Sequence, residues 1–370
     1  MSCVMLFGIG DLGGWVLEFL ARSEGVGTII TCDLREDWGA MKTECAAIGA
    51  GQQGYNKRIK FEKCDVNDID ETAELLKKYN PDVIYSALTL LGWLEMRVIP
   101  QAIGPKYHKA TACLTPLNVP LISKLMKARE KAGITAPVVN NSFPDVVNPV
   151  LWKNGLGPLV GAGNIDLMVG EIRRKVSVAE NVPMGEVIVY LIAEHAIIPQ
   201  GVRTGVPFFL KVMVGDKNIT SKFDVDSLIS DSVLAATPPE WTTWLNEPFV
   251  AASAVRNIMA MINDTNELAH SPGPNGLPGG YPIRIGARGV EVVLPEEITM
   301  EEAIRINLDG LKYEGVAEIK DDGTVVLTDE AYNIQKEIYG LDLREFHFAD
   351  MEDIAKELRA VGKKLIAKYS

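Results

Sequence analysis

Three glycines near the start of the chain have the spacing of a phosphate-binding turn. The apolar run Val4–Phe7 is followed by Gly8-Ile9-Gly10-Asp11-Leu12-Gly13 and then by an amphipathic stretch. Gly8 allows a sharp turn, Gly10 lacks a Cβ atom and lets a phosphate approach the backbone, and Gly13 allows the next helix to pack closely on the strand. The N–H groups and dipole of that helix start favour a pyrophosphate. The residues from Gly8 to Gly13 are therefore predicted to bind a dinucleotide.

An acid at the end of the second apolar run bears on which dinucleotide binds. Asp33 lies 20 residues after Gly13 and closes the run that begins at Gly27. Its carboxylate could accept hydrogen bonds from a ribose diol, which favours NAD because a 2′-phosphate would meet a negative charge. Arg35 leaves NADP open, since its guanidinium could pair with that phosphate. Strand, glycine turn, helix, strand and acid in this order predict a nucleotide-binding βαβ unit.

Two further strand ends are candidates for contacts with the same cofactor. Asp65 and Val66 follow the predicted strand Arg58–Cys64. Asp65 could reach the adenine, or this turn could simply begin the helix Ile69–Tyr79, and the two interpretations are compatible. Ser86, Ala87 and Leu88 end the predicted fourth strand, whose carboxyl end faces the ligand crevice in a doubly wound sheet. These three residues are expected near the ribose on the nicotinamide side.

The remaining pattern predicts two domains in an α/β chain. Residues 1–158 are predicted to form a doubly wound parallel-sheet Rossmann domain, and residues 159–370 an α+β substrate domain. The irregular stretch Thr89–Thr115 is expected to be a lid or binding loop. Pro248–Leu268 is expected to form a long helix, and the glycine- and proline-rich stretch Ser271–Tyr281 an irregular surface loop. Most of the tail after Thr328 has the apolar spacing of amphipathic helices.

Composition narrows the classes of partner. The 370 residues carry 37 Lys plus Arg against 49 Asp plus Glu, a net charge of −12, and no basic run stands out, so a nucleic-acid partner is not expected. Five cysteines form no CxxC pair, which is typical of reduced thiols in a cytosolic protein. No apolar run approaches the length of a membrane span, and no signal peptide precedes the first strand. We therefore expect a cytoplasmic protein that acts on a small molecule away from membranes.

The second half resembles the catalytic half of the lactate and malate dehydrogenase superfamily. The similarity rests on segments that keep their order over about residues 138–310: Val138–Asp145, Gly161–Asp166, Ala193-Glu194-His195, Met261–Asn266 and Gly289–Pro295. The first domain is more similar to the Rossmann unit of saccharopine dehydrogenases or extended short-chain reductases, chiefly through Asp65-Val66. The resemblance implies an NAD(P)-dependent oxidoreductase that acts on a hydroxy or oxo group of a small polar metabolite. It also implies a homodimer or homotetramer.

The resemblance assigns roles to individual residues. His195 matches the histidine that exchanges a proton with the carbinol oxygen, a role that suits imidazole because hydride transfer to a carbonyl leaves an alkoxide. Asn141, or else Asn140, would polarise the substrate carbonyl, Asp166 would orient His195, and Arg97 matches the arginine of a mobile loop. A strand-end histidine satisfied by the backbone is the structural alternative for His195.

The departures from the family concern the substrate. Where the family has an arginine that binds a substrate carboxylate, three residues after Asp166, this chain has Val169, so a simple 2-hydroxy acid is not the expected substrate. Asn164 could contact a different polar group. Arg203 could replace the missing cation, or it could be a solvated loop residue.

Two other functions share this architecture. One is an NAD- and metal-dependent glycosidase, although Asn164 stands where those enzymes have a cysteine ligand, and His195 with Asp166 would have to hold the metal. The other is a dinucleotide-binding sensor without catalysis. We assign no metal site from the sequence.

Overall fold

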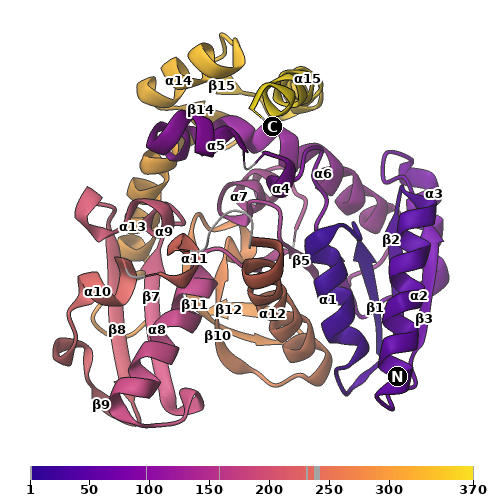
Figure 1. The fold of residues 1–370 in the computed structure, drawn as a ribbon, viewed down its shortest axis with the longest axis horizontal. Coiled ribbons are helices and arrows are strands. Elements are labelled where there is room, and N and C mark those ends of the chain that lie inside the picture. The colour runs from indigo at the N-terminus through magenta and orange to yellow at the C-terminus, as the bar shows by residue number, and fades with distance from the viewer. Residues whose placement is uncertain (1, 97, 158, 231, 237–241, 370) are drawn as a thin grey trace.

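The structure is a computed structural model that describes residues 2–96, 98–157, 159–230, 232–236 and 242–369 (Figure 1). Its first sheet is parallel throughout and has the strand order β3-β2-β1-β4-β5-β6. The strands are β1 (Ser2–Phe7), β2 (Val26–Asp33), β3 (Arg58–Lys63), β4 (Val83–Ser86), β5 (Val138–Asn140) and β6 (Leu159–Gly161). This is the order of a Rossmann sheet, and it confirms the predicted doubly wound architecture. The sheet continues through β6, just beyond the boundary expected at residue 158.

Alternation along β1 explains how both faces of this sheet are covered. Val4 and Leu6 pack with α1 (Asp11–Ala21) and α2 (Glu36–Gln52), whereas Met5 and Phe7 belong to the core on the opposite face. That opposite face is covered by α3 (Ile69–Tyr79), α6 (Thr115–Lys131) and α7 (Pro144–Lys153). The long helix α12 (Thr242–Asn263) comes from the later half of the chain and packs beside α1 (Figure 1). The two halves therefore share a core.

The second sheet is antiparallel, and one of its strands leads to His195. Its order is β10-β11-β7-β8-β9, with β12 on β11. The strands are β7 (Val187–Ala193), β8 (Phe208–Val214), β9 (Lys217–Asn218), β10 (Glu267–Pro272), β11 (Gly280–Gly286) and β12 (Gly289–Val292). α8 (Ile165–Glu180) packs its apolar side on β7. The shorter helices of this half are α9 (Ile197–Gln200), α10 (Val225–Ser230), α11 (Val233–Ala236) and α13 (Met300–Leu311).

Two expectations for this half are wrong. The helix expected over Pro248–Leu268 is α12, which ends at Asn263 because the chain enters β10 at Glu267. The stretch Ser271–Tyr281 is not a surface loop, since residues 270–274 and 279–281 are buried. Its glycines let it press against α7: a Cβ atom at Gly273 would lie 2.3 Å from the carbonyl oxygen of Pro144.

The C-terminal part forms a third unit that covers the first domain. It contains β13 (Val316–Ile319), β14 (Val325–Leu327), β15 (Glu345–Phe346), α14 (Asp329–Tyr339) and α15 (Met351–Tyr369). The two helices were predicted, but the small sheet was not. Figure 1 shows α14 and α15 above α5 (Val98–Ile103) and α6. Among the described residues, no helix has both the length and the apolar character that crossing a bilayer requires.

The expected lid is helical where it is described. Its elements are α4 (Trp93–Met96), α5 (Val98–Ile103) and the 3₁₀ segment η1 (Gly104–Leu114). Ile99 and Tyr107 are buried together with Leu341 and Leu358 of the C-terminal unit. Lys106 and Lys109 pair with Glu337 and Glu330 of α14. The expectation of an irregular loop is wrong because the apolar partners lie more than 200 residues away in sequence.

Candidate active site

The glycine turn has the geometry expected of a phosphate-binding loop. A Cβ atom at Gly13 would lie 1.9 Å from the carbonyl oxygen of Gly8, so only glycine permits this close packing. Above Gly10 there is open space, since its nearest neighbour would be an Arg35 nitrogen at 4.0 Å. No side chain caps α1, which leaves the N–H groups at Asp11, Leu12 and Gly13 available to an anion. These residues fit a dinucleotide phosphate.

Side chains at the end of β2 and in α2 form hydrogen bonds with this turn. Asp33 accepts hydrogen bonds from the backbone N–H groups of Ile9 at 2.8 Å and Arg35 at 2.9 Å. Lys42 donates to the carbonyl oxygen of Gly10 at 2.6 Å, and Trp38 donates to that of Ile9 at 3.0 Å. Asp33 thus links the glycine turn to the start of α2, next to the position where a ribose is expected.

The other proposed cofactor contacts lie at strand ends. Ser86 ends β4 and is fully buried, and Ala87 continues the ladder by donating to Phe7 at 3.0 Å. Leu88 lies beside Gly8. Asp65 accepts hydrogen bonds from Asn67, and Val66 is buried under α3. It is Asp68, not Asp65, whose side chain caps α3. Asp65 is therefore free of the helix-capping role, and its contact with adenine stays a prediction.

His195 follows β7 and is held by an acid that the sequence analysis did not single out. Its Nδ1 atom lies 2.5 Å from Oε1 of Glu314, which belongs to the 3₁₀ turn η7 (Lys312–Glu314) after α13. The His195 side chain is 28% exposed and the Glu314 side chain only 1%. The bond to Nδ1 leaves Nε2 as the ring nitrogen able to meet a ligand. His195 is thus oriented by a side chain, and the alternative of a histidine satisfied by the backbone is wrong.

Three further titratable groups surround this pair. Asp145 at the start of α7 and Glu194 beside His195 are fully buried, and His108 of η1 is partly buried. Burial lowers the pKa of His195, but the charge and hydrogen bond of Glu314 and the charge of Asp145 outweigh it and raise that pKa to about 9. Burial raises the pKa of Asp145 to about 6 and that of Glu194 well above its ordinary value. Burial also lowers the pKa of His108.

Asp166 does not orient His195. Its Oδ1 atom accepts a hydrogen bond from Arg256 at 3.0 Å and its Oδ2 atom one from Ser253 at 2.5 Å. Both partners come from α12, which the sequence analysis did not connect with α8. The expectation that Asp166 orients His195 is therefore wrong. Within the described ranges, no group of three or more His, Cys, Asp and Glu side chains is arranged to hold a metal ion.

The asparagines expected in the site lie close to it. Asn164 donates to Oδ2 of Asp145, one of the acids beside His195. Asn141 donates to the carbonyl oxygen of Ala162 at 3.0 Å, and its own buried Oδ1 atom has no hydrogen-bond partner in the described chain. Asn140 is bound to Asn148 at 2.9 Å, so Asn141 is the better candidate of the two.

The two arginines proposed for the substrate have different outcomes. Arg203 lies at the surface with 86% of its side chain exposed and pairs with Asp226, which matches the solvated-loop interpretation. Arg97 lies outside the described residues, so its assignment stays a prediction.

A series of contacts connects the glycine turn with His195. Leu88 lies beside Gly8, and its carbonyl oxygen accepts a hydrogen bond from Ser142 at 2.7 Å. Three residues later Asp145 acts electrostatically on His195. The glycine turn thus lies at the carboxyl edge of the first sheet, where ligands bind in folds of this type, and His195 is connected with it through Asp145.

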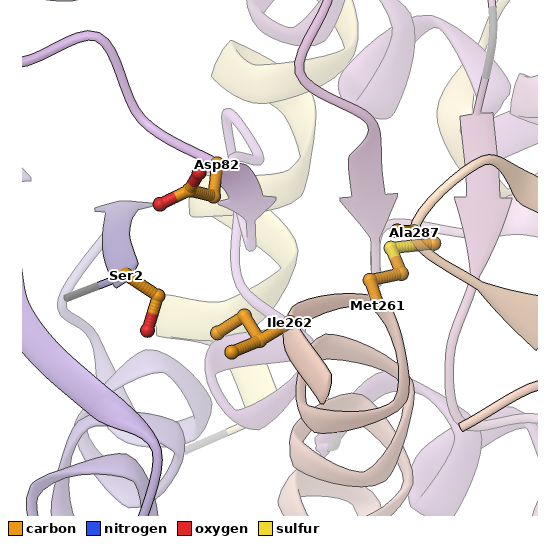
Figure 2. Close-up of a pocket in the computed structure, with 5 residues that line it drawn as sticks. All are labelled: Ser2, Asp82, Met261, Ile262 and Ala287. Carbon is orange, nitrogen blue, oxygen red and sulfur yellow. The ribbon is translucent and has the colours of Figure 1, made fainter. Parts of the chain in front are cut away.

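An open hollow elsewhere in the molecule is unrelated to this edge. Figure 2 shows that it is lined by Ser2, Asp82, Met261, Ile262 and Ala287. Ser2 begins β1 and Asp82 precedes β4, so the hollow lies at the amino ends of the strands.

Solved structures similar to this fold are lactate and malate dehydrogenases. A lactate dehydrogenase from a Medee basin deep-sea metagenome library is 17% identical with a TM-score of 0.59, covering 84% of this chain and 96% of that chain. The malate dehydrogenase of Aeropyrum pernix is 16% identical with a TM-score of 0.57 and the same coverage. That of Picrophilus torridus is 18% identical with a TM-score of 0.57, covering 85% and 96%. No protein-family model and no curated protein matches the sequence.

These similarities confirm the predicted fold class, a Rossmann domain followed by a catalytic domain of lactate/malate dehydrogenase type. At such identities they establish the fold alone.

Proposed function

We propose that the protein is an NAD(P)-dependent oxidoreductase that acts on a hydroxy or oxo group of a small polar metabolite. The observations that carry this proposal are the histidine held by Glu314 after β7 and the uncapped glycine turn after β1. Similar solved structures include lactate and malate dehydrogenases, which supports the same reaction class.

The glycine turn would hold the cofactor. The N–H groups of Asp11, Leu12 and Gly13 would bind the pyrophosphate, and Asp33 with Arg35 would meet the adenine ribose. Asp65, Val66 and the β4 end from Ser86 to Leu88 would line the remaining surface. When bound, the nicotinamide supplies or accepts the hydride. Both NAD and NADP remain candidates, because Asp33 favours a ribose diol and Arg35 a 2′-phosphate.

His195 would exchange the proton that hydride transfer requires. Reduction of a carbonyl leaves an alkoxide, and a protonated imidazole nearby neutralises that charge as it develops. The raised pKa of His195, about 9, means that the protonated form prevails at neutral pH. His195 is therefore suited to donate its proton to the product of a reduction.

The substrate has to be recognised by groups other than an arginine that binds a carboxylate. Val169 stands at the position of that arginine, and His195 has the buried acids Glu314 and Asp145 among the charges that act on it and buried Glu194 next to it in sequence. Asn141 and Asn164 can supply amide hydrogen bonds, and we propose Asn141 for the reacting oxygen. A neutral, hydroxyl-bearing substrate suits this surface better than a 2-oxo acid.

Three further assignments stay predictions. They are the similarity of the first domain to saccharopine dehydrogenases or short-chain reductases, the cytoplasmic location and the homo-oligomeric state. A metal-dependent glycosidase would lose turnover on addition of a chelator, whereas a hydride-only enzyme would not.

Cofactor binding to two alanine variants tests the proposal. In Gly10→Ala the new Cβ meets no protein atom closer than 4.0 Å, so the fold should persist while NADH or NADPH binds about tenfold more weakly or worse. Gly51→Ala, also in open space on α2, is the matched control and should bind like the wild type. Fluorescence titration with each nucleotide measures both. Lack of affinity of the wild type for either nucleotide would overturn the proposal.

A further inference from the structure

We propose that Glu314 and Glu194 form a carboxyl pair that shares one proton and positions His195 as a permanently oriented, protonated acid. The catalytic consequence rests on the proposed function, but the pair itself can be tested without any substrate. The sequence alone does not indicate this role for either glutamate.

The contact between Glu314 and His195 is short and shielded. The Nδ1 to Oε1 distance is 2.5 Å, and 99% of the Glu314 side chain is removed from solvent. A carboxylate in such a place strengthens the hydrogen bond from an imidazolium and fixes the plane of the ring. Glu314 is therefore the group that orients His195.

The second glutamate lies behind the first. Glu194 is fully buried, its Oε2 atom accepts a hydrogen bond from the N–H group of Ala196 at 2.7 Å, and burial together with the neighbouring charge of Glu314 raises the pKa of its carboxyl group. Without a shared proton, Oε1 of Glu194 and Oε2 of Glu314 would both be buried acceptors lacking any donor in the described chain. One proton between the carboxyl groups satisfies both oxygens and removes the repulsion of two buried negative charges.

The backbone holds the two acids together. A Cβ atom at Gly310 of α13 would lie 2.5 Å from Cβ of Glu194, so α13 can approach the end of β7 only with glycine at this point. Gly315 adopts a φ of +98°, and a Cβ there would lie 2.5 Å from that of Ala331 in α14. The turn that bears Glu314 thus packs closely against α14 of the C-terminal unit.

The other charged groups around the pair fit a single net negative charge. Asp145 of α7 and His108 of η1 interact electrostatically with Glu314 and His195, and Tyr107 interacts electrostatically with Glu314. Tyr107 is neutral at ordinary pH because burial raises its pKa. With one proton shared, the two glutamates together carry one negative charge, which balances the positive charge of a protonated His195. Asp145 is then a further acid near the pair.

Histidine NMR of the intact protein tests the pair directly. With ¹³C-labelled histidine, the His195 resonance, assigned by its loss in His195→Asn, should titrate well above the ordinary value of 6.5. In Glu314→Gln the midpoint should fall below 6.5, because only the lowering effect of burial and the weaker effect of Asp145 remain. In Glu194→Gln it should stay close to the wild-type value, since the amide replaces a carboxyl group that is already neutral and can still donate to Glu314.

A control variant and two contrary results make this test decisive. Asp166→Asn, which alters the acid that binds Arg256 instead, should leave the titration of His195 unchanged. A large fall in Glu194→Gln would show that Glu194 is ionised and would refute the shared proton, and an unchanged midpoint in Glu314→Gln would refute the role of Glu314. Should Glu314→Gln not fold, the infrared carbonyl band of a protonated carboxyl group decides: it should be present in the wild type and lost in Glu194→Gln.

Activity distinguishes this inference from the proposed function. If the NMR results hold but no nucleotide binds, the pair stands and the oxidoreductase proposal fails. If turnover is found, Glu314→Gln should shift the pH limit of kcat to lower pH while Asp166→Asn does not.

Discussion

A single histidine shows how burial and a neighbouring charge compete. Removal of His195 from water favours its neutral form, and the adjoining Glu314 favours the charged form more strongly. An ion pair of this kind contributes to folding as well as to chemistry, because the unfolded chain lacks it.

The stability of the protein should therefore decrease in alkaline solution. The pKa of His195 is raised from 6.5 in an unfolded chain to about 9 in the fold, so its contribution is fully present below about pH 6.5 and is lost as pH rises through 9. We expect a loss of about 1–3 kcal/mol between pH 6.5 and 10. Urea unfolding of the wild type and His195→Asn measures it: the difference between their unfolding free energies should shrink with rising pH. A constant difference would contradict the ion pair.

The residues of the site differ in how well sequence can predict them. Gly8, Gly10, Gly13 and Asp33 form a local pattern whose spacing follows from one turn, and the structure has the predicted geometry. Glu314 is 119 residues from His195, in a turn with no motif, and only the packing of α13 against β7 brings it there. Asp166 has the expected spacing, yet Arg256 and Ser253 of α12 bind both of its oxygens.

At the scale of elements, long amphipathic segments were predictable and the contacts between distant segments were not. The bounds expected for α3 agree with the structure because this segment has a clear apolar period and a defined end. The stretch from Thr89 to Thr115 lacks that period, since its apolar residues face the C-terminal unit rather than one continuous core.

The contact between this stretch and α15 should be worth several kcal/mol. Leu358 is 1% exposed and packs in the cluster that contains Ile99 and Tyr107. Leu358→Ala should lower the free energy of unfolding by about 2–5 kcal/mol, because it removes buried methyl groups and leaves a cavity. Leu308→Ala, at a position that is 41% exposed on α13, is the control and should cost much less. Equal effects in thermal or urea unfolding would show that α15 does not anchor the stretch.

At the scale of the molecule, three sheets are joined by shared helices. α12 fills the face of the first sheet beside α1, and the C-terminal unit closes over the helices on the other side (Figure 1). Similar dehydrogenases cover 84–85% of the chain, so the fold includes further structure beyond the shared part.

An exposed apolar stripe on α2 supports the proposed oligomer. Trp38, Met41, Cys45 and Ile48 recur at helical spacing on its outer side, with Met41 68% and Ile48 54% exposed. We expect light scattering to give the mass of a homodimer or larger assembly. The double substitution Met41→Glu with Ile48→Glu should shift that mass to the monomer, because two buried charges would oppose association. A wild type that is monomeric at high concentration would contradict the oligomer.

Turnover by His195→Asn shows whether this histidine exchanges the proton of the reaction. A set of small hydroxy- and oxo-metabolites, supplied with NADH or NADPH or their oxidised forms, is assayed with the wild type and the variant. We expect the wild type to transfer hydride to or from at least one of them, and His195→Asn to bind the nucleotide normally but to lose at least about a hundredfold in kcat. Undiminished turnover in the variant would show that His195 takes no part in proton transfer.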